Sequence, residues 1–151
     1  AQNSALPPCD LSHKGRGLAL RGNAVKLGPA TRARGTTLKG LIMKRMAMVL
    51  GIKPEHIPEY KRIHAAVWPE ILAQISACNI RNYSIYLREP ENLLFGYWEY
   101  HGNDFAADAA KMAADPKTQE WWAICMPMQT PLTPRAEGEW WAMMPEVFHH
   151  D

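Results

Sequence analysis

The sequence lacks long apolar runs and closely spaced cysteines. Lys, Arg, Glu or Pro interrupts every apolar stretch before it reaches the roughly 18 residues that a membrane-spanning helix needs. Cys9, Cys78 and Cys125 are odd in number and far apart, which favours neither a disulfide framework nor a zinc site. We therefore expect a protein of the reducing cytoplasm with no contact to a membrane.

The sequence also lacks the short motifs that bind nucleotides or activate a nucleophile. It contains no GxGxxG, no P-loop, no GxSxG and no HExxH. His56 and His64 would lie two turns apart on a helix, which disfavours a metal pair. We expect neither a metal nor a cofactor, so the remaining classes are cofactor-free proton transfer and pure binding.

Acidic and aromatic residues are scarce at the N-terminus. Residues 1–42 carry seven Lys and Arg, one acid and no aromatic residue, so this segment has a charge of +6 and the rest of the chain −4. With much Gly and Pro and no sustained periodicity, residues 1–42 are predicted to be a disordered extension or leader before Met43. Two alternatives are a targeting segment, which the Gly and Pro content disfavours, and a tail that binds nucleic acid, which the acidic remainder disfavours. The folded domain is predicted to span 43–151.

The folded part predicts alternating strands and helices. Apolar, β-branched and aromatic runs indicate strands, and helical spacing with Asp or Pro at the start indicates helices. Glu89, Pro90 and Glu91 predict a hairpin between the second and third strands. Strands are predicted over 43–52, 81–90, 92–100 and 139–150. One helix is predicted over 53–78. A second is predicted in two pieces, over 102–115 opened by Asn103 or Asp104, and over 115–126 opened by Asp115.

The order βαββαβ is that of a ferredoxin-like α+β sandwich, in which both helices cover one face of a four-stranded antiparallel sheet. Apolar and aromatic residues nevertheless occupy both faces of strand 92–100, with Leu93, Phe95 and Tyr97 on one and Leu94, Trp98 and Tyr100 on the other. A monomer would leave one such face in water. We expect a homodimer that packs through this open sheet face as a dimeric α/β barrel.

The stretch "EYKRIHAAVWPEI" places Tyr60 and His64 one turn apart on the apolar face of the predicted helix 53–78. A buried polar ring without a partner costs about 1 to 3 kcal/mol, so both rings need hydrogen bonds. They are either a core pair bonded to the backbone or part of a site, and Pro69 favours a kink with a cavity beside them.

Tryptophan is abundant, with the neighbouring pairs Trp121–Trp122 and Trp140–Trp141. Adjacent residues of a helix point about 100° apart, so Trp121 and Trp122 cannot both be central core residues. The tryptophans either fill the core and a dimer interface or line a site, and aromatic faces beside a histidine and a tyrosine suit a sugar.

From about Met43 to Phe148 the sequence resembles the L-rhamnose mutarotase family. The resemblance lies in "EYKRIHAAVWPEI", "NYSIYL", "NLLFGYWE", "WW" at 121–122 and "EVF" near the end. It implies a dimeric ferredoxin-like isomerase of rhamnose metabolism that interconverts the α and β anomers of L-rhamnopyranose, or a related 6-deoxysugar, without a cofactor. It also implies that His64 is the general acid and that Tyr60, Tyr83, Trp121 and Trp122 contact the sugar.

Two other interpretations stay open at this point. One is a cofactor-free monooxygenase or haem-degrading enzyme of the same dimeric fold, and the other is a non-catalytic sugar-binding module. The resemblance leaves the general base unnamed. Residues 1–42 have no counterpart in the family, and the loop 127–138 departs from it, so the exact sugar stays open.

Overall fold

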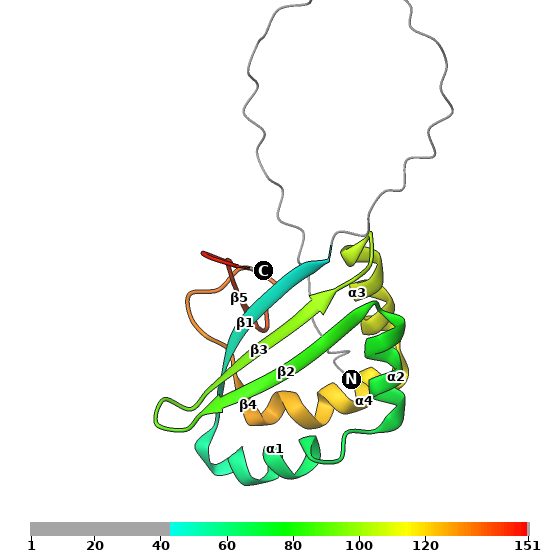
Figure 1. The fold of residues 1–151 in the computed structure, drawn as a ribbon. Coiled ribbons are helices and arrows are strands. Elements are labelled where there is room, and N and C mark those ends of the chain that lie inside the picture. Colours follow the sequence, from blue (N-terminus) through cyan, green and yellow to red (C-terminus); the bar gives the residue numbers. More distant parts are fainter. Residues whose placement is uncertain (1–42, 151) are drawn as a thin grey trace, which may run out of the picture.

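The fold is built on one curled antiparallel sheet, seen in a computed structural model that describes residues 43–150 (Figure 1). Residues 1–42, predicted to be disordered, lie outside the described residues, as does residue 151. The long central strand β1 pairs with β3 on one side, and β3 pairs with β2. The other side of β1 pairs with two short strands. The strands are β1 (Lys44–Ile52), β2 (Ile80–Arg88), β3 (Leu93–Tyr100), β4 (Gln129–Thr130) and β5 (Ala142–Met144).

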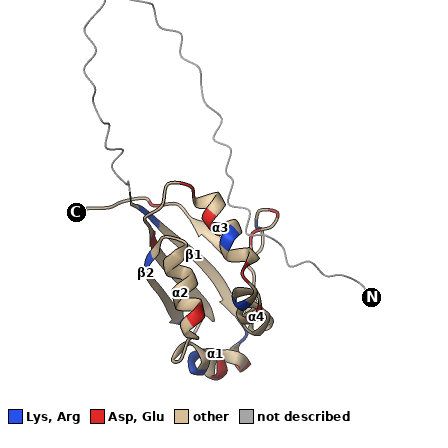
Figure 2. Ribbon diagram, turned by 90° about the vertical axis from the view of Figure 1, so that its right-hand side faces the viewer, with Lys and Arg blue, Asp and Glu red and all other residues tan. Residues whose placement is uncertain are grey.

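The helices cover one face of this sheet. Seen from the side, α2 lies between β2 on the left and α4 on the right, and α3 lies above α4 (Figure 2). The predicted ferredoxin-like α+β order, with the strand sequence β2-β3-β1-β4 across the sheet, is confirmed. The helices are η1 (Pro54–His56), α1 (Ile57–His64), α2 (Pro69–Ala77), α3 (Phe105–Ala114), α4 (Pro116–Cys125) and η2 (Met126–Met128).

The single helix predicted over 53–78 is wrong, because the chain leaves the helix after His64 and starts a new one at Pro69. Trp68 is extended, with ψ of 136°, as steric contact with a following proline favours. Pro69 then occupies the first position of α2, where its missing N–H is harmless. Tyr60 and His64 remain one turn apart, both on α1.

The predicted last strand over 139–150 is also wrong in extent. Only Ala142–Met144 pairs with β1, and the strand ends before Pro145, which has no N–H to donate.

A strand that was not predicted, β4, forms inside the proline-rich loop and pairs with Gly51 and Ile52. A Cβ at Gly51 would lie 2.6 Å from the Thr130 carbonyl oxygen, so this pairing needs glycine.

The caps of α3 and α4 agree with the prediction. Asp104 accepts a hydrogen bond from the Ala107 N–H, and Asp115 accepts one from the Thr118 N–H. Each aspartate satisfies a backbone donor that the first turn of a helix leaves unpaired.

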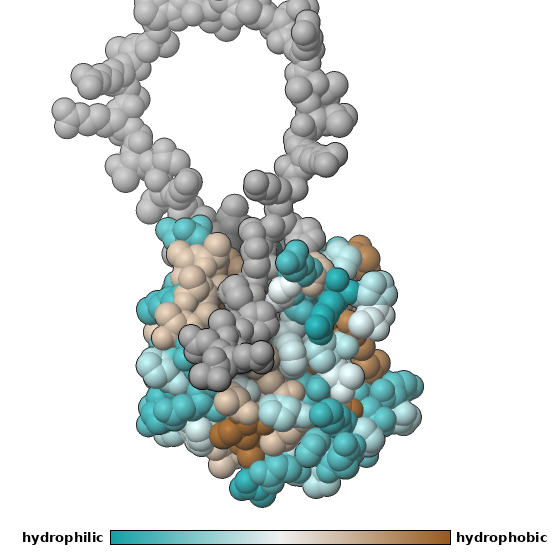
Figure 3. Space-filling model, turned by 180° about the vertical axis from the view of Figure 1, so that it is seen from behind, coloured by the Kyte–Doolittle hydropathy of each residue, from teal (hydrophilic) through white to brown (hydrophobic). Residues whose placement is uncertain are grey.

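The main core lies between the sheet and helices α1, α2 and α4. It contains Ile52 and Leu94 from the strands and Tyr60, Ile71 and Trp121 from the helices. The opposite face of the sheet carries Phe95 and Tyr97 of β3 next to Tyr86 of β2, which is 63% exposed. The part of the rear face that is visible carries hydrophilic residues with hydrophobic patches among them (Figure 3).

Candidate active site

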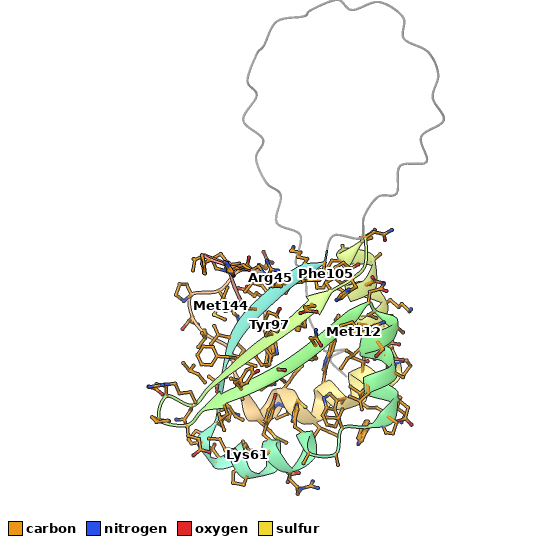
Figure 4. All side chains as sticks on the ribbon, in the orientation of Figure 1. Arg45, Lys61, Tyr97, Phe105, Met112 and Met144 are labelled. Carbon is orange, nitrogen blue, oxygen red and sulfur yellow. The ribbon has the colours of Figure 1, made fainter. Side chains whose placement is uncertain are left out.

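A cavity of about 180 Å³ lies between the sheet and the helices. This volume is below the roughly 300 to 1,000 Å³ of sites for drug-sized ligands, so it suits a smaller molecule. Phe105 and Met112 of α3 reach it from one end of the molecule, and α1, on which Lys61 is labelled, lies at the other (Figure 4). All five residues predicted to form a site line it: Tyr60, His64, Tyr83, Trp121 and Trp122.

His64 is half-buried in the last turn of α1. Its Nδ1 lies 2.9 Å from the carbonyl oxygen of Tyr60. A carbonyl only accepts, so Nδ1 carries the hydrogen, and Nε2 holds the lone pair of the neutral ring. Burial lowers the pKa of His64 from its ordinary 6.5, and the backbone hydrogen bond opposes this only in part. At neutral pH the ring is therefore mainly neutral, and Nε2 is able to accept a proton.

Tyr60 is buried, with 5% of its surface exposed, and its ring stacks on His64. The two ring centroids are 4.0 Å apart at an interplanar angle of 24°. Trp121 meets the His64 ring edge-on at 5.4 Å, so two aromatic rings contact the imidazole. Burial raises the pKa of Tyr60, and the neighbouring Tyr83 adds to this, so the phenol keeps its hydrogen at neutral pH.

Tyr83 reaches the cavity because β2 contains a bulge. The pairing with β3 shifts between Arg81 and Ser84, so two residues of β2 have no direct partner there. The shift places Ile80 and Ile85, five positions apart, on the same cavity-lining face, which strict alternation forbids. Tyr83 lines the cavity between them, with its ring edge-on to Trp98 at 5.1 Å.

Several cavity residues were not predicted from the sequence. Asp108 of α3 is the only carboxylate among the lining residues, and it accepts hydrogen bonds from the Tyr100 hydroxyl and the Asn79 amide at 2.7 and 2.8 Å. Gln129 of β4 accepts a hydrogen bond from the Trp140 indole at 2.7 Å. Trp140 stood out in the sequence as an aromatic residue, whereas Gln129 had no signal because its loop shows no periodicity.

Within the described part of the chain, no three His, Cys, Asp or Glu side chains come close enough to hold a metal ion. None of the helices formed by residues 43–150 combines the length and apolar character that crossing a membrane requires.

Comparison with known proteins identifies the family. A family model described as L-rhamnose mutarotase matches residues 45–150. An L-rhamnose mutarotase of Phocaeicola vulgatus is 34% identical over 115 residues, covering 72% of this chain and 100% of the relative. One of Oceanobacillus iheyensis is 32% identical over 109 residues, with the same two coverages.

A solved structure supports the fold. The crystal structure of an L-rhamnose mutarotase from Formosa agariphila aligns with a TM-score of 0.56 at 20% identity, covering 72% of this chain and 99% of that one. The family match gives no support to an oxygenase, a haem-degrading enzyme or a non-catalytic sugar-binding module. The resemblance seen in the sequence motifs is confirmed, and the chain belongs to the L-rhamnose mutarotase family.

Proposed function

We propose that this protein is an isomerase that interconverts the α and β anomers of L-rhamnopyranose, or of a closely related 6-deoxysugar, without a cofactor. The observation that carries the proposal is the setting of His64. Its Nδ1–H is bound by the Tyr60 carbonyl, which leaves Nε2 to meet a ligand in the cavity that the ring lines. An imidazole with a pKa near neutrality both takes and gives protons.

In the proposed reaction His64 acts as base and then as acid. Nε2 takes the proton of the C1 hydroxyl as C1=O forms and the bond from C1 to the ring oxygen breaks. The imidazolium then gives that proton to the ring oxygen. Rotation about the C1–C2 bond presents the other face of the aldehyde, and the reverse steps close the ring as the other anomer. No atom or electron is gained or lost, so no co-reactant is needed.

The remaining predicted residues hold the sugar. Trp121 and Trp122 offer ring faces to the C–H face of the pyranose. The hydroxyls of Tyr60 and Tyr83 offer hydrogen bonds to its oxygens. Much of the rest of the lining is apolar, including Ile71, Ile75 and Met112, which suits a sugar that carries a methyl group in place of a hydroxymethyl group.

The proposal also covers the domain bounds, the location in the cell and the dimer. Residues 43–151 form the mutarotase domain of a cytoplasmic protein, and two copies pack through the open sheet face. Supporting this, Tyr86 on that face is 63% exposed, and Val147 and Phe148 near the C-terminus are 94% and 81% exposed. Large apolar side chains left in water in this way favour a partner surface.

Saturation-difference proton NMR on equilibrated L-rhamnose tests the activity. Irradiating one anomeric proton in the presence of catalytic protein is expected to transfer saturation to the other. His64→Ala is expected to lower the transfer at least 100-fold, since general acid–base catalysis typically contributes 10² to 10⁴. His101→Ala is the matched control, because His101 is exposed and does not line the cavity.

Full exchange activity in a folded His64→Ala protein would contradict the role of His64. Absence of exchange with wild-type protein, for L-rhamnose and other 6-deoxysugars alike, would contradict the proposed function.

A further inference from the structure

A chain of three polar side chains reaches the cavity from the edge of the sheet. The Trp140 Nε1–H donates to Gln129 Oε1 at 2.7 Å, and Gln129 Nε2 lies 3.5 Å from the Tyr60 hydroxyl oxygen. All three residues line the cavity, and Gln129 is buried. They come from three separate segments: α1, β4 and the residues just before β5.

The direction of these hydrogen bonds follows from their donors and acceptors. An indole nitrogen only donates, so the atom of the Gln129 amide that faces Trp140 must be the oxygen. The amide orientation is thereby settled by its neighbour rather than chosen between two flips. The amide nitrogen, which only donates, then faces the Tyr60 hydroxyl.

This arrangement determines where the hydrogen of Tyr60 goes. Because Gln129 donates, the Tyr60 oxygen accepts and the phenolic hydrogen must point elsewhere. Among the described residues, Gln129 is the only hydrogen-bond partner of this hydroxyl. The contact of 3.5 Å is long, as hydrogen bonds of catalytic sites often are before substrate binds. Tyr60 lines the cavity, so an oxygen of a sugar bound there could accept the phenolic hydrogen.

We propose that Gln129, held by Trp140, is a positioning residue that commits the Tyr60 hydroxyl to donate its hydrogen to an oxygen of the sugar. The inference rests on the proposed function and deepens it, because it gives Tyr60 a direction and adds a group that acts through Tyr60. It also means that Tyr60 selects for a sugar oxygen that accepts a hydrogen bond.

Gln129→Glu tests this directly, because a carboxylate has acceptors only. The new side chain keeps the bond from Trp140 but draws the Tyr60 hydrogen toward itself and away from the sugar. The KM for L-rhamnose, measured from anomer exchange at increasing sugar concentration, is expected to rise about tenfold, which corresponds to one lost hydrogen bond. The kcat is expected to change less, because Tyr60 holds the sugar and His64 moves the proton.

The second arm of the test uses a background without the hydroxyl. In Tyr60→Phe, adding Gln129→Glu is expected to raise KM no further, because Gln129 acts only through that hydroxyl. Gln119→Glu is the matched control, since Gln119 is exposed on α4 and its amide donates to the Ala113 carbonyl, away from the cavity lining. It is expected to exchange anomers as the wild type does.

Two outcomes overturn the inference while the wild type is active. One is an unchanged KM in folded Gln129→Glu, and the other is an equal rise in KM in the Tyr60→Phe background. If Gln129→Glu does not fold, Trp140→Phe replaces it, because this variant keeps an aromatic ring but removes the N–H that orients Gln129. Its KM is expected to rise in the wild-type background and to rise no further in the Tyr60→Phe background. A wild-type protein that exchanges no anomers is a different result, because it contradicts the proposed function itself.

Discussion

His64 is the residue whose protonation is expected to set the pH dependence of exchange. Burial lowers its pKa below the ordinary 6.5, so the neutral form is the major one at pH 7. The proposed reaction starts from this neutral form. The catalysed exchange rate is therefore expected to be constant above about pH 7 and to fall as the pH drops through the lowered pKa.

Saturation-transfer measurements between about pH 5 and 8 check this, with the uncatalysed rate subtracted at each pH. The residual rate in His64→Ala is expected to lack the inflection. A catalysed rate that rises as the pH falls would contradict the order of steps and favour a protonated His64 at the start.

Residue types and local spacing carried the prediction of Tyr60 and His64, because one helical turn is enough to bring them together. Their stacking at 4.0 Å is a direct consequence of that spacing. The side chain that contacts the Tyr60 hydroxyl was not predictable from local spacing. Gln129 lies 69 positions beyond Tyr60 in the chain, in a segment with no regular pattern.

At the scale of elements, the start of α4 is expected to matter for stability and for the site. The Asp115 carboxylate accepts from the Thr118 N–H at 2.7 Å and from the Thr118 hydroxyl at 2.9 Å. Thr118 is buried, so Asp115→Ala leaves two donors without this acceptor. The free energy of unfolding is expected to fall by about 1 to 2 kcal/mol.

Urea unfolding followed by circular dichroism measures this change, with Asp115→Asn as the control that retains a carbonyl acceptor. Because α4 carries Trp121 and Trp122, the KM for L-rhamnose is expected to rise in Asp115→Ala as well. Equal unfolding midpoints for the wild type and Asp115→Ala would contradict the importance of this cap.

The break between α1 and α2 was not visible in the apolar periodicity of the sequence. The apolar spacing from Tyr60 to Cys78 predicted one continuous helix, yet His64 ends α1 and Pro69 opens α2. Ile71 and Cys78 are still buried and still line the cavity. A turn between two short helices satisfies the same burial as one long helix, so the periodicity alone does not distinguish them.

At the scale of the whole molecule, the proposed dimer is tested through the open sheet face. Tyr86→Lys places a charge where Tyr86 and Phe95 pair across β2 and β3. Size-exclusion chromatography with light scattering is expected to give twice the chain mass for the wild type and a shift toward one chain for Tyr86→Lys.

Leu72→Lys is the control, since Leu72 is similarly exposed, at 53%, but lies on α2, on the other side of the sheet. It is expected to leave the mass unchanged. A wild-type protein with the mass of one chain at every concentration would contradict the dimer.

Local sequence patterns were enough to predict the alternation of strands and helices, the Asp115 cap, the start of α3 at Asn103 or Asp104, and the one-turn spacing of Tyr60 and His64. These depend on neighbours within a few positions, where backbone sterics and side-chain hydrogen bonds act locally. Long-range contacts set three other features: β1 pairs with both β4 and β5, a bulge aims Tyr83 at the cavity, and Gln129 meets Tyr60. Those features arise from pairing with β1 and β3 and from packing across the cavity, where segments distant in sequence compete for the same partners.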